Sequence, residues 1–333
     1  MSDGSSKTRV GLTLGKFAPL HRGHQHLIET ALSEVDRLIV MIYDCPDVTD
    51  VRLHVRARWI RDLYPQVEVI EALHGPSEVS TEPEITQAHD AYILRTLAGR
   101  RVTHVYSSEF YGDHVSRALG AEDRRVDPQR ARFPISGTRV RESPYEYRTW
   151  IAPRVYRDLI RNVVFMGAPS TGKTTLCQRL ALRYQTPWMP EYGREYWETH
   201  QQDRRLTPEQ LVEIGWGHIE REDQLLLESN RYLFTDTNAL TTLLFARHYH
   251  GYGLPRLEQL ADATASRYAL TFLCDDDIPY EDTWDRSGEA NRREFQEWTM
   301  EELRRRGIAY TLLTGSVDER EARAVDVLSG RWR

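Results

Sequence analysis

The chain has 333 residues, of which 40% are hydrophobic and 28% are charged, and its formal net charge at pH 7 is −6. This composition predicts a soluble globular protein that is long enough for two domains, each with a core of its own. Since the net charge is negative, no global positive field would draw the protein to nucleic acid or anionic lipid, and we expect neither a nucleic-acid partner nor a membrane.

The cysteines and the hydropathy pattern suggest where the protein works. The sequence has no apolar run of about 18 residues and no signal-peptide pattern. Its three cysteines, Cys45, Cys177 and Cys274, are far apart and odd in number, which predicts neither a disulfide framework nor a zinc site. We therefore expect a cytoplasmic protein. The sequence leaves its oligomeric state open, a homo-oligomer included.

The first predicted strand, residues 10–15, ends in glycine and is followed by a His-x-Gly-His pattern at 21–24. The second histidine of the pattern is expected to open an amphipathic helix, whose N-terminus favours anions. Two imidazoles there would donate hydrogen bonds to phosphoryl oxygens without supplying a nucleophile. Taken alone, such a pair is equally compatible with an incomplete metal site or with two surface histidines. The candidate phosphate-site residues of this segment are Gly15, Lys16, Phe17, His21, Gly23 and His24.

Strands and helices alternate over the following hundred residues, as a doubly wound parallel α/β sheet requires. Strands are predicted at 37–43, 67–70 and 103–108, and helices at 55–63 and 90–98. Ligands of such sheets bind outside the carboxyl ends of the strands, so the polar residues at those ends are candidates for a site. They are Tyr43, Asp44, Ser107 and Glu109, and ordinary loop polarity explains each of them equally well.

A second cluster of phosphate-binding residue types follows at 135–141, where Ser136, Thr138 and Arg141 begin a short predicted helix. Hydroxyls and a guanidinium at a helix N-terminus supply the donors and the fixed positive charge that a polyphosphate needs. Without the first cluster, the same residues would be read as a helix cap. Together the two segments resemble the signature motifs of the nucleotidyltransferase superfamily, which transfers adenylyl or cytidylyl groups from a nucleoside triphosphate.

Residues 144–158 are predicted to connect two domains, and a phosphate-binding loop follows at 167–174. This phosphate loop reads Gly-Ala-Pro-Ser-Thr-Gly-Lys-Thr between an apolar strand, 162–166, and a helical pattern. Its backbone N–H groups would cradle a triphosphate, its lysine would reach the β- and γ-phosphates, and its threonine hydroxyl would hold Mg²⁺. The candidate ATP-binding residues are Gly167, Ser170, Thr171, Gly172, Lys173, Thr174 and Thr175.

Further candidates for a phosphoryl-transfer site lie beyond the phosphate loop. A helix is predicted at 207–229, and strands at 232–236, 270–275 and 309–313. Asp236 ends the first of these strands, where it would support Mg²⁺ or orient the attacking hydroxyl; the sequence does not distinguish these two roles. The segment 190–196 carries Glu191, Tyr192, Arg194 and Glu195, which are candidates for holding a sugar hydroxyl or a phosphate, although an exposed charged helix explains them too.

The stretch 285–293 resembles the lid of phosphate-loop kinases, which supplies arginines to the transferring phosphoryl group. Arg286 and Arg292 are the candidates for this role. The chain departs from the usual lid pattern at 285–288, which leaves the identity of the lid arginine open.

Several further segments resemble a narrower family, the NadR-type bifunctional proteins. They are 56–60, 106–109, Val126-Asp127-Pro128-x-Arg130 and the kinase segment 190–196, with the two domains in the same order. The resemblance implies a nicotinamide mononucleotide (NMN) adenylyltransferase domain at 8–150 and a ribosylnicotinamide kinase domain at 160–330. Longer members of the family carry a helix-turn-helix and repress transcription. Too few residues precede the first strand for such a domain, so we do not expect a repressor role.

The same resemblance implies the chemistry and the roles of particular residues. Nicotinamide riboside would be phosphorylated by ATP to NMN, and NMN would be adenylylated by ATP to NAD and pyrophosphate, with Mg²⁺ as cofactor. Lys16, His21, His24 and Arg141 would stabilise the adenylyl transfer, and Lys173, Asp236 and Glu191 the phosphoryl transfer. Arg56 and Trp59 would bind the mononucleotide, the indole by stacking on the pyridinium, although a core position for Trp59 is at least as good an interpretation.

Two other functions remain open on the sequence alone. One is a nucleotidyltransferase–kinase fusion that acts on another pair of small substrates, because the two phosphate motifs specify ATP and not the acceptor. The other is a non-catalytic regulator whose conformation is set by ATP and NAD. The presence of His21, His24, Lys173 and Asp236 together argues against the regulator.

Overall fold

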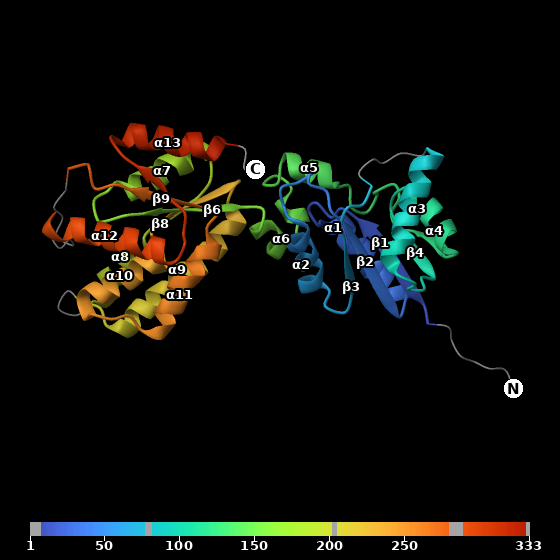
Figure 1. The fold of residues 1–333 in the computed structure, drawn as a ribbon, viewed down its shortest axis with the longest axis horizontal. Coiled ribbons are helices and arrows are strands. Elements are labelled where there is room, and N and C mark those ends of the chain that lie inside the picture. The colour runs from blue at the N-terminus through green and yellow to red at the C-terminus, as the bar shows by residue number, and fades with distance from the viewer. Residues whose placement is uncertain (1–7, 77–81, 202–204, 280–288, 331–333) are drawn as a thin grey trace. The chain divides into compact units, whose positions relative to one another are not determined.

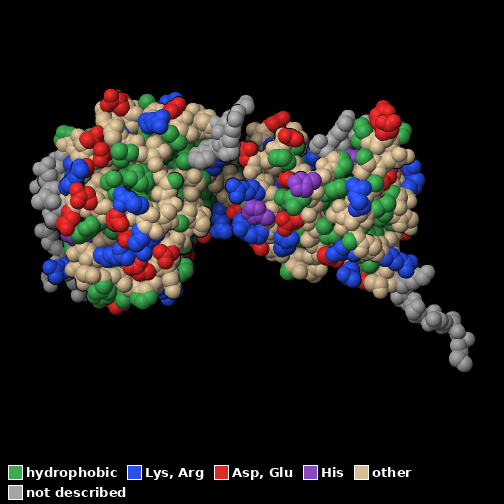
Figure 2. Space-filling model, in the orientation of Figure 1, with side chains coloured by type: hydrophobic (Ala, Val, Ile, Leu, Met, Phe, Trp, Pro, Cys, Tyr) green, Lys and Arg blue, Asp and Glu red, His purple; other side chains and the backbone are tan. Residues whose placement is uncertain are grey.

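The computed structural model describes residues 8–76, 82–201, 205–279 and 289–330. The chain divides after Leu159 into two compact units, which we call unit 1 (to Leu159) and unit 2 (from Ile160). Each unit is a parallel sheet with helices on its two faces (Figure 1). On the face shown in Figure 2, acidic and basic side chains are interspersed over both units.

Unit 1 contains a five-stranded parallel sheet of order β3-β2-β1-β4-β5. The strands are β1 (Val10–Gly15), β2 (Arg37–Tyr43), β3 (Glu68–Ala72), β4 (His104–Ser107) and β5 (Glu122–Arg125). The helices are α1 (Arg22–Glu34), α2 (Leu53–Leu63), α3 (Pro83–Leu97), α4 (Tyr111–Leu119), α5 (Gly137–Glu142) and α6 (Pro153–Arg157), with a 3₁₀ turn at Arg148–Trp150. Strands β2 and β3 follow on one side of β1 within the sheet, and β4 and β5 follow on its other side. Folds of this kind bind ligands where the strand order reverses, which here is between β1 and β4.

The central strands of unit 1 are buried on both faces, as their continuous apolar sequences require. Leu12 and Leu14 of β1 pack with Ile39 and Met41 of β2 against the inward sides of α3 and α4. The phosphate-motif segment after β1 and the segment that begins α5 therefore emerge from a rigid core.

Unit 2 contains a second five-stranded parallel sheet, of order β10-β9-β6-β8-β7. The strands are β6 (Arg161–Met166), β7 (Trp188–Met189), β8 (Tyr232–Asp236), β9 (Leu270–Cys274) and β10 (Thr311–Leu313). The helices are α7 (Lys173–Tyr184), α8 (Tyr192–His200), α9 (Pro208–Glu228), α10 (Ala239–His250), α11 (Pro255–Arg267), α12 (Glu289–Arg305) and α13 (Val317–Ser329). The strands β6 and β8 are neighbours, so the phosphate loop and Asp236 end side by side.

Alternate residues of β6 face two separate cores in unit 2. Val163 and Phe165 pack under α7 and α13, and Val164 and Met166 pack against α9, α10 and α11. Figure 1 shows these helices on opposite sides of the sheet. Because both faces of β6 are covered, the carboxyl end of this strand is held firmly where the phosphate loop begins.

The predicted fold class, two doubly wound parallel α/β sheets, is confirmed. The strand at 37–43 has the predicted bounds, and the helix predicted at 207–229 is α9, with Thr207 as its N-cap and a capping box to Gln210. The connection at 144–158 contains more order than predicted, because α6 buries Val155 and Tyr156 in unit 1. Two short strands were not predicted: β5, whose four residues are all charged, and β7, which is only two residues long.

In the parts of the chain that the structure describes, no helix combines the length and the hydropathy needed to span a membrane. Cys45, Cys177 and Cys274 are all free and buried.

Candidate active sites

A cavity of about 820 Å³ opens at the carboxyl ends of the unit 1 strands. It is lined by residues from the β1–α1 segment, the ends of β2 and β4, and the start of α5. The predicted residues among them are Gly15, Lys16, Phe17, His21, Gly23, His24, Tyr43, Asp44, Glu109, Ser136, Thr138 and Arg141. The two phosphate motifs, more than a hundred residues apart in the sequence, therefore face one cavity.

The two histidines stack, with ring centroids 3.8 Å apart. The backbone N–H of His21 donates to Nδ1 of His24 at 3.4 Å, which puts the proton of a neutral His24 on Nε2. Burial and the charge of Arg130 lower the pKa of His21 to about 4, and burial, His21 and Arg130 lower that of His24 well below its ordinary value. The His21 side chain faces the backbone N–H of His24 in a capping box at the start of α1, although its buried Nδ1 makes no full hydrogen bond in the described structure.

The backbone around the histidines allows this stacking. A Cβ at Gly23 would lie 3.1 Å from the His21 ring, so a larger residue there would push the imidazole aside. Phe17 has a φ of 45°, a left-handed conformation that a non-glycine residue adopts only when its surroundings hold it. The Phe17 ring, buried against His24 at a centroid distance of 5.0 Å, provides that restraint.

The second motif lines the same cavity and lies directly against the first. The Ser136 hydroxyl accepts the Arg139 backbone N–H at 3.3 Å and caps α5. The Arg141 guanidinium donates to the Ala18 carbonyl at 2.5 Å and to the Thr138 hydroxyl at 3.1 Å. Arg141 therefore ties the second motif to the segment that follows β1, and both motifs present donors to the cavity.

Arg56, Trp59 and Ser107 were predicted to contact substrate, and the structure corrects all three, because none of them lines the cavity. Arg56 is buried and donates to the carbonyls of Lys16, Tyr43 and Val51, so it supports the cavity wall from behind.

The other two corrections have similar causes. Trp59 has no exposed surface, and its indole N–H donates to the Asp158 carboxylate at 2.9 Å, so it anchors the end of unit 1 instead of stacking on a ligand. Ser107 is buried, and its hydroxyl donates to the Glu109 carbonyl at 3.2 Å.

Sequence reasoning missed one part of the cavity lining. His74, His89, Phe110, Tyr111, His114 and Arg130 line it from loops and from α3 and α4. They are brought together only by the tertiary fold. Of these, Arg130 alone carried a sequence signal, since it belongs to the segment 126–130 that resembles the NadR-type family.

Unit 2 has a cavity of about 540 Å³ over the phosphate loop. The predicted residues that line it are Gly167, Ser170, Thr171, Gly172, Lys173, Thr174, Thr175, Glu191 and Arg194. The loop needs its first glycine, because Gly167 has a φ of 134° and a Cβ there would lie 2.5 Å from the Cys274 carbonyl. Further lining comes from α8, α10 and the segment after β9, including Trp197, Thr241, Phe245 and Ile278.

The lysine and the threonine of the phosphate loop both form hydrogen bonds within the site. Nζ of Lys173 donates to the carbonyls of Gly167 and Ala168, at 3.0 and 2.8 Å, and so lies within the curl of the loop. The Thr174 hydroxyl donates to one carboxylate oxygen of Asp236 at 2.5 Å. The other carboxylate oxygen of Asp236 is buried without a hydrogen-bond partner in the described structure. A hydroxyl and a carboxylate in contact fit a hard cation such as Mg²⁺.

Two acidic side chains beside the phosphate loop, Glu191 and Asp236, have raised pKa values. Burial and the Asp236 carboxylate raise the pKa of Glu191, while burial raises that of Asp236. Lys173 and Arg194 oppose both shifts. This is the environment of a carboxylate that can take up a proton, because its charged form is poorly solvated.

Two residues of α8, predicted to bind substrate, do not line the cavity. Glu195 is exposed and forms a bidentate ion pair with Arg221 of α9, at 2.5 and 2.8 Å. Tyr192 packs its ring under the same guanidinium, 4.1 Å from the ring centroid. These contacts correct both predictions: the two side chains hold α8 against α9, and Glu191 and Arg194 remain at the cavity.

The two predicted lid arginines have different outcomes. Arg286 lies outside the described residues, so the structure gives no account of it. Arg292 is buried and does not line the cavity, but it donates to the Ser170 carbonyl of the phosphate loop at 3.2 Å and to the Ile278 carbonyl at 2.9 Å. It therefore braces the phosphate loop from α12.

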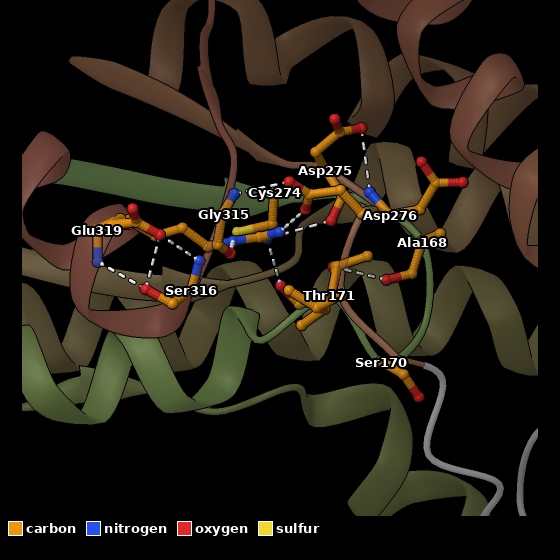
Figure 3. Close-up of polar contacts among 12 residues, drawn as sticks. Ala168, Ser170, Thr171, Cys274, Asp275, Asp276, Gly315, Ser316 and Glu319 are labelled. Atoms are coloured by element: carbon orange, nitrogen blue, oxygen red, sulfur yellow. Dashed lines mark hydrogen bonds and ion pairs between the residues drawn. The ribbon is translucent and has the colours of Figure 1, made fainter.

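Sequence reasoning also missed a buried arginine beneath the phosphate loop. Arg320 of α13 has no exposed surface, and it donates to the carbonyls of Thr171, Asp275 and Gly315 at 3.0, 3.1 and 2.8 Å and pairs with Asp277. Figure 3 shows Thr171, Asp275 and Gly315 converging on one point from three separate segments. The phosphate loop is therefore linked to the end of β9 and to the start of the last helix.

Comparison with known proteins agrees with this division of the chain. Residues 12–143 match a family model described as cytidylyltransferase-like, and residues 162–320 match one described as an AAA domain. A crystal structure of a NadR protein in complex with NAD and AMP-PNP superposes with a TM-score of 0.57 at 25% identity, covering 96% of this chain and 95% of that one.

Curated relatives extend over nearly the whole chain. The trifunctional NAD biosynthesis/regulator protein NadR of Escherichia coli (strain K12) is 30% identical over 350 residues, covering 97% of this chain and 83% of that protein. The protein of the same description from Salmonella typhimurium (strain LT2) is also 30% identical, covering 96% of this chain and 82% of its own length. Each unit has a cavity lined by its phosphate-binding residues, and NadR proteins are 30% identical to this chain over nearly its whole length. The chain therefore belongs to the NadR family.

Proposed function

We propose that the protein is a bifunctional NAD-salvage enzyme, in which unit 2 phosphorylates nicotinamide riboside to NMN and unit 1 adenylylates NMN to NAD. The observation that carries this proposal is the presence of two separate cavities, each with a complete set of phosphate-binding groups of a different chemical kind. A relative whose crystal structure contains both NAD and AMP-PNP supports the use of pyridine and adenine nucleotides.

In unit 1, catalysis consists of positioning and of stabilising charge. The NMN phosphate attacks the α-phosphorus of ATP in line, and pyrophosphate leaves. Lys16, His21 and His24 stabilise the charge on the transferred group, while Ser136, Thr138 and Arg141 hold the β- and γ-phosphates. The two imidazoles are neutral in the free protein because their pKa values are low, and an anionic polyphosphate beside them favours the protonated form.

In unit 2, the attacking group is a ribose hydroxyl, which must lose a proton. Glu191, at the cavity and with a raised pKa, accepts that proton as the hydroxyl attacks the γ-phosphorus. Lys173 moves from the loop carbonyls to the β- and γ-phosphates, and Arg194 contacts phosphate or ribose. Thr174 and Asp236 would hold Mg²⁺, which neutralises charge on the phosphates when bound.

The substrates in this proposal are nicotinamide riboside, NMN and ATP, and the product is NAD. Because both steps consume ATP, the proposal fits a cytoplasmic enzyme. Within this chain, each cavity is lined by residues of one unit.

The test is to incubate the purified protein with nicotinamide riboside and Mg-ATP and to quantify every product. We expect NMN first and NAD after it, with one ADP and one pyrophosphate released for each NAD formed. ATP binding of normal affinity without turnover of riboside or NMN would contradict the proposal and favour a regulator. Turnover of a different acceptor in preference to both would favour another substrate pair.

A further inference from the structure

A short loop between β5 and α5 has a shape that is fixed by one carboxylate. Asp127 and Arg130 both adopt left-handed conformations, with φ of 46° and 52°. The Asp127 carboxylate accepts the backbone N–H of Ala131 at 2.8 Å and those of Arg132 and Phe133 at 3.2 Å. The Arg130 N–H donates to the Asp127 carbonyl at 2.8 Å. Since these bonds determine the loop, the Arg130 side chain is not needed to hold it.

The Arg130 side chain lines the unit 1 cavity together with His21, His24 and Ser136. It is close enough to both histidines for its charge to lower their pKa values, after the larger effect of burial. Its guanidinium pairs with the Glu109 carboxylate at 3.0 Å, with side chains 44% and 53% exposed. Exposed ion pairs contribute little to stability, so Glu109 is a partner that a phosphate can replace.

The other arginines near this cavity are held differently. Arg141 donates to the Ala18 carbonyl and to Thr138, and Arg56 is buried behind the wall on three carbonyls. Both of these guanidiniums are engaged in hydrogen bonds to other parts of the protein, whereas that of Arg130 pairs with the exposed Glu109 carboxylate. Two neutral imidazoles and a planar guanidinium facing one cavity are complementary to a phosphoryl chain.

We propose that Arg130 is a further catalytic residue of unit 1, which leaves Glu109 and binds oxygens of the α- and β-phosphoryl groups during adenylyl transfer. The proposal rests on the function proposed for that unit. In this step an NMN phosphate oxygen forms a bond to the α-phosphorus. The bond from that phosphorus to the bridging oxygen breaks, and pyrophosphate leaves with the bonding electron pair. Arg130 stays protonated and stabilises the charge that develops on the leaving group.

The test uses the full chain carrying Lys173→Ala, so that the phosphate loop of unit 2 does not obscure the measurement. In this parent we compare Arg130→Ala, Arg130→Lys and the control Arg132→Ala, which removes an equal charge from the same loop but outside the cavity. The measurements are kcat/KM for NAD formation from NMN and Mg-ATP, pyrophosphate affinity by titration calorimetry, and the unfolding temperature.

We expect Arg130→Ala to lower kcat/KM by about 100-fold and pyrophosphate affinity by about 10-fold, with the unfolding temperature unchanged. Arg130→Lys should recover part of both, because an ammonium keeps the charge but not the planar fork. Arg132→Ala should stay within about twofold of the parent.

Equal values for Arg130→Ala and Arg132→Ala would overturn the proposal. If Arg130→Ala does not fold, Arg130→Lys decides: weaker pyrophosphate binding at an unchanged unfolding temperature supports the proposal, and parental binding overturns it. A parent that binds pyrophosphate but makes no NAD contradicts the function proposed for unit 1, while the pyrophosphate affinities of the variants still decide the role of Arg130. A parent that does not bind pyrophosphate overturns both.

Discussion

Units 1 and 2 both place a loop and a helix N-terminus after their first strand, but they surround that loop with different side chains. In unit 1 two stacked imidazoles stand beside hydroxyls and arginines. In unit 2 the phosphate loop has a lysine, and two carboxylates with raised pKa values, Glu191 and Asp236, lie next to it.

The difference follows from the group that attacks the phosphorus. A phosphate monoester is already an anionic nucleophile, so a site that uses it needs donors and positive charge but no base. A sugar hydroxyl is a poor nucleophile until its proton is accepted, so its site needs a carboxylate and, with Asp236, a place for a metal ion. The same fold class thus serves two chemistries, because its loops carry different residues.

The largest expected effect separates the two sites completely. Lys173→Ala should lower the rate of riboside phosphorylation by at least about 1,000-fold, because the transferring phosphates lose their fixed positive charge. Adenylylation of supplied NMN should remain within about twofold, since Lys173 lies in unit 2. Both rates are measured by chromatography of the products, and loss of both activities in a folded variant would contradict two independent sites.

His24→Ala should have the opposite pattern. Loss of a donor to the transferred group is expected to lower NAD formation from NMN by about 10²–10³-fold and to leave the kinase step unchanged. The matched control is His26→Ala on the same helix, whose ring packs on Phe133 at a centroid distance of 5.2 Å. Equal effects of the two substitutions would show that α1 tolerates neither change and that His24 has no special role.

Glu191→Gln tests the need for a base in unit 2. The amide keeps the shape of the side chain but cannot accept the proton, so riboside phosphorylation should fall by about 100-fold. In the parent protein, kcat should decrease as pH falls through the raised pKa of Glu191, above its ordinary value of 4.5, and the variant should lack this limb. Glu195→Gln, which alters the ion pair with Arg221 outside the cavity, is the control and should stay within about twofold. A variant Glu191→Gln with a parental rate would remove Glu191 from the mechanism.

Low pH should destabilise unit 1 through His21. Its pKa falls from 6.5 to about 4 on folding, so the unfolded chain binds more protons between these values. Stability is therefore complete above pH 6.5 and decreases as pH falls toward 4, by at most about 3 kcal/mol. Chemical denaturation at several pH values measures the unfolding free energy as a function of pH. Its slope against pH should be smaller in His21→Gln than in the parent. Identical slopes would mean that the histidine is not buried in its neutral form.

The smallest expected effect concerns Trp59. Since its indole N–H donates to the partly buried carboxylate of Asp158, Trp59→Phe should lower the unfolding free energy of unit 1 by about 1–2 kcal/mol. The KM for NMN should not change, because the ring does not line the cavity. A KM that rises several-fold with unchanged stability would restore the stacking role that the sequence suggested.

The His-x-Gly-His segment of unit 1 and the phosphate loop of unit 2 could be predicted, because each depends on a short continuous segment of strand, loop and helix N-terminus. The contribution of Arg320 could not, because it holds backbone groups that only the tertiary fold brings near. The loop held by Asp127 is local, but it depends on left-handed conformations at Asp127 and Arg130, which non-glycine residues do not reveal in a sequence. For Trp59 the sequence left two roles open, stacking on substrate and a position in the core, and its complete burial supports the second. Its segment resembles a substrate-binding family motif, but the inward face of α2 places the indole in the core. A resemblance to a family predicts the fold around a residue more reliably than it predicts which groups the side chain contacts.

The most direct test of two independent sites is a mixture of two variants. Lys173→Ala and His24→Ala, each inactive on its own in converting nicotinamide riboside to NAD, are combined with riboside and Mg-ATP. The account predicts that the mixture forms NAD, because NMN made by unit 2 of one variant reaches unit 1 of the other. A mixture that forms no NAD, although each variant retains its remaining step, would contradict it.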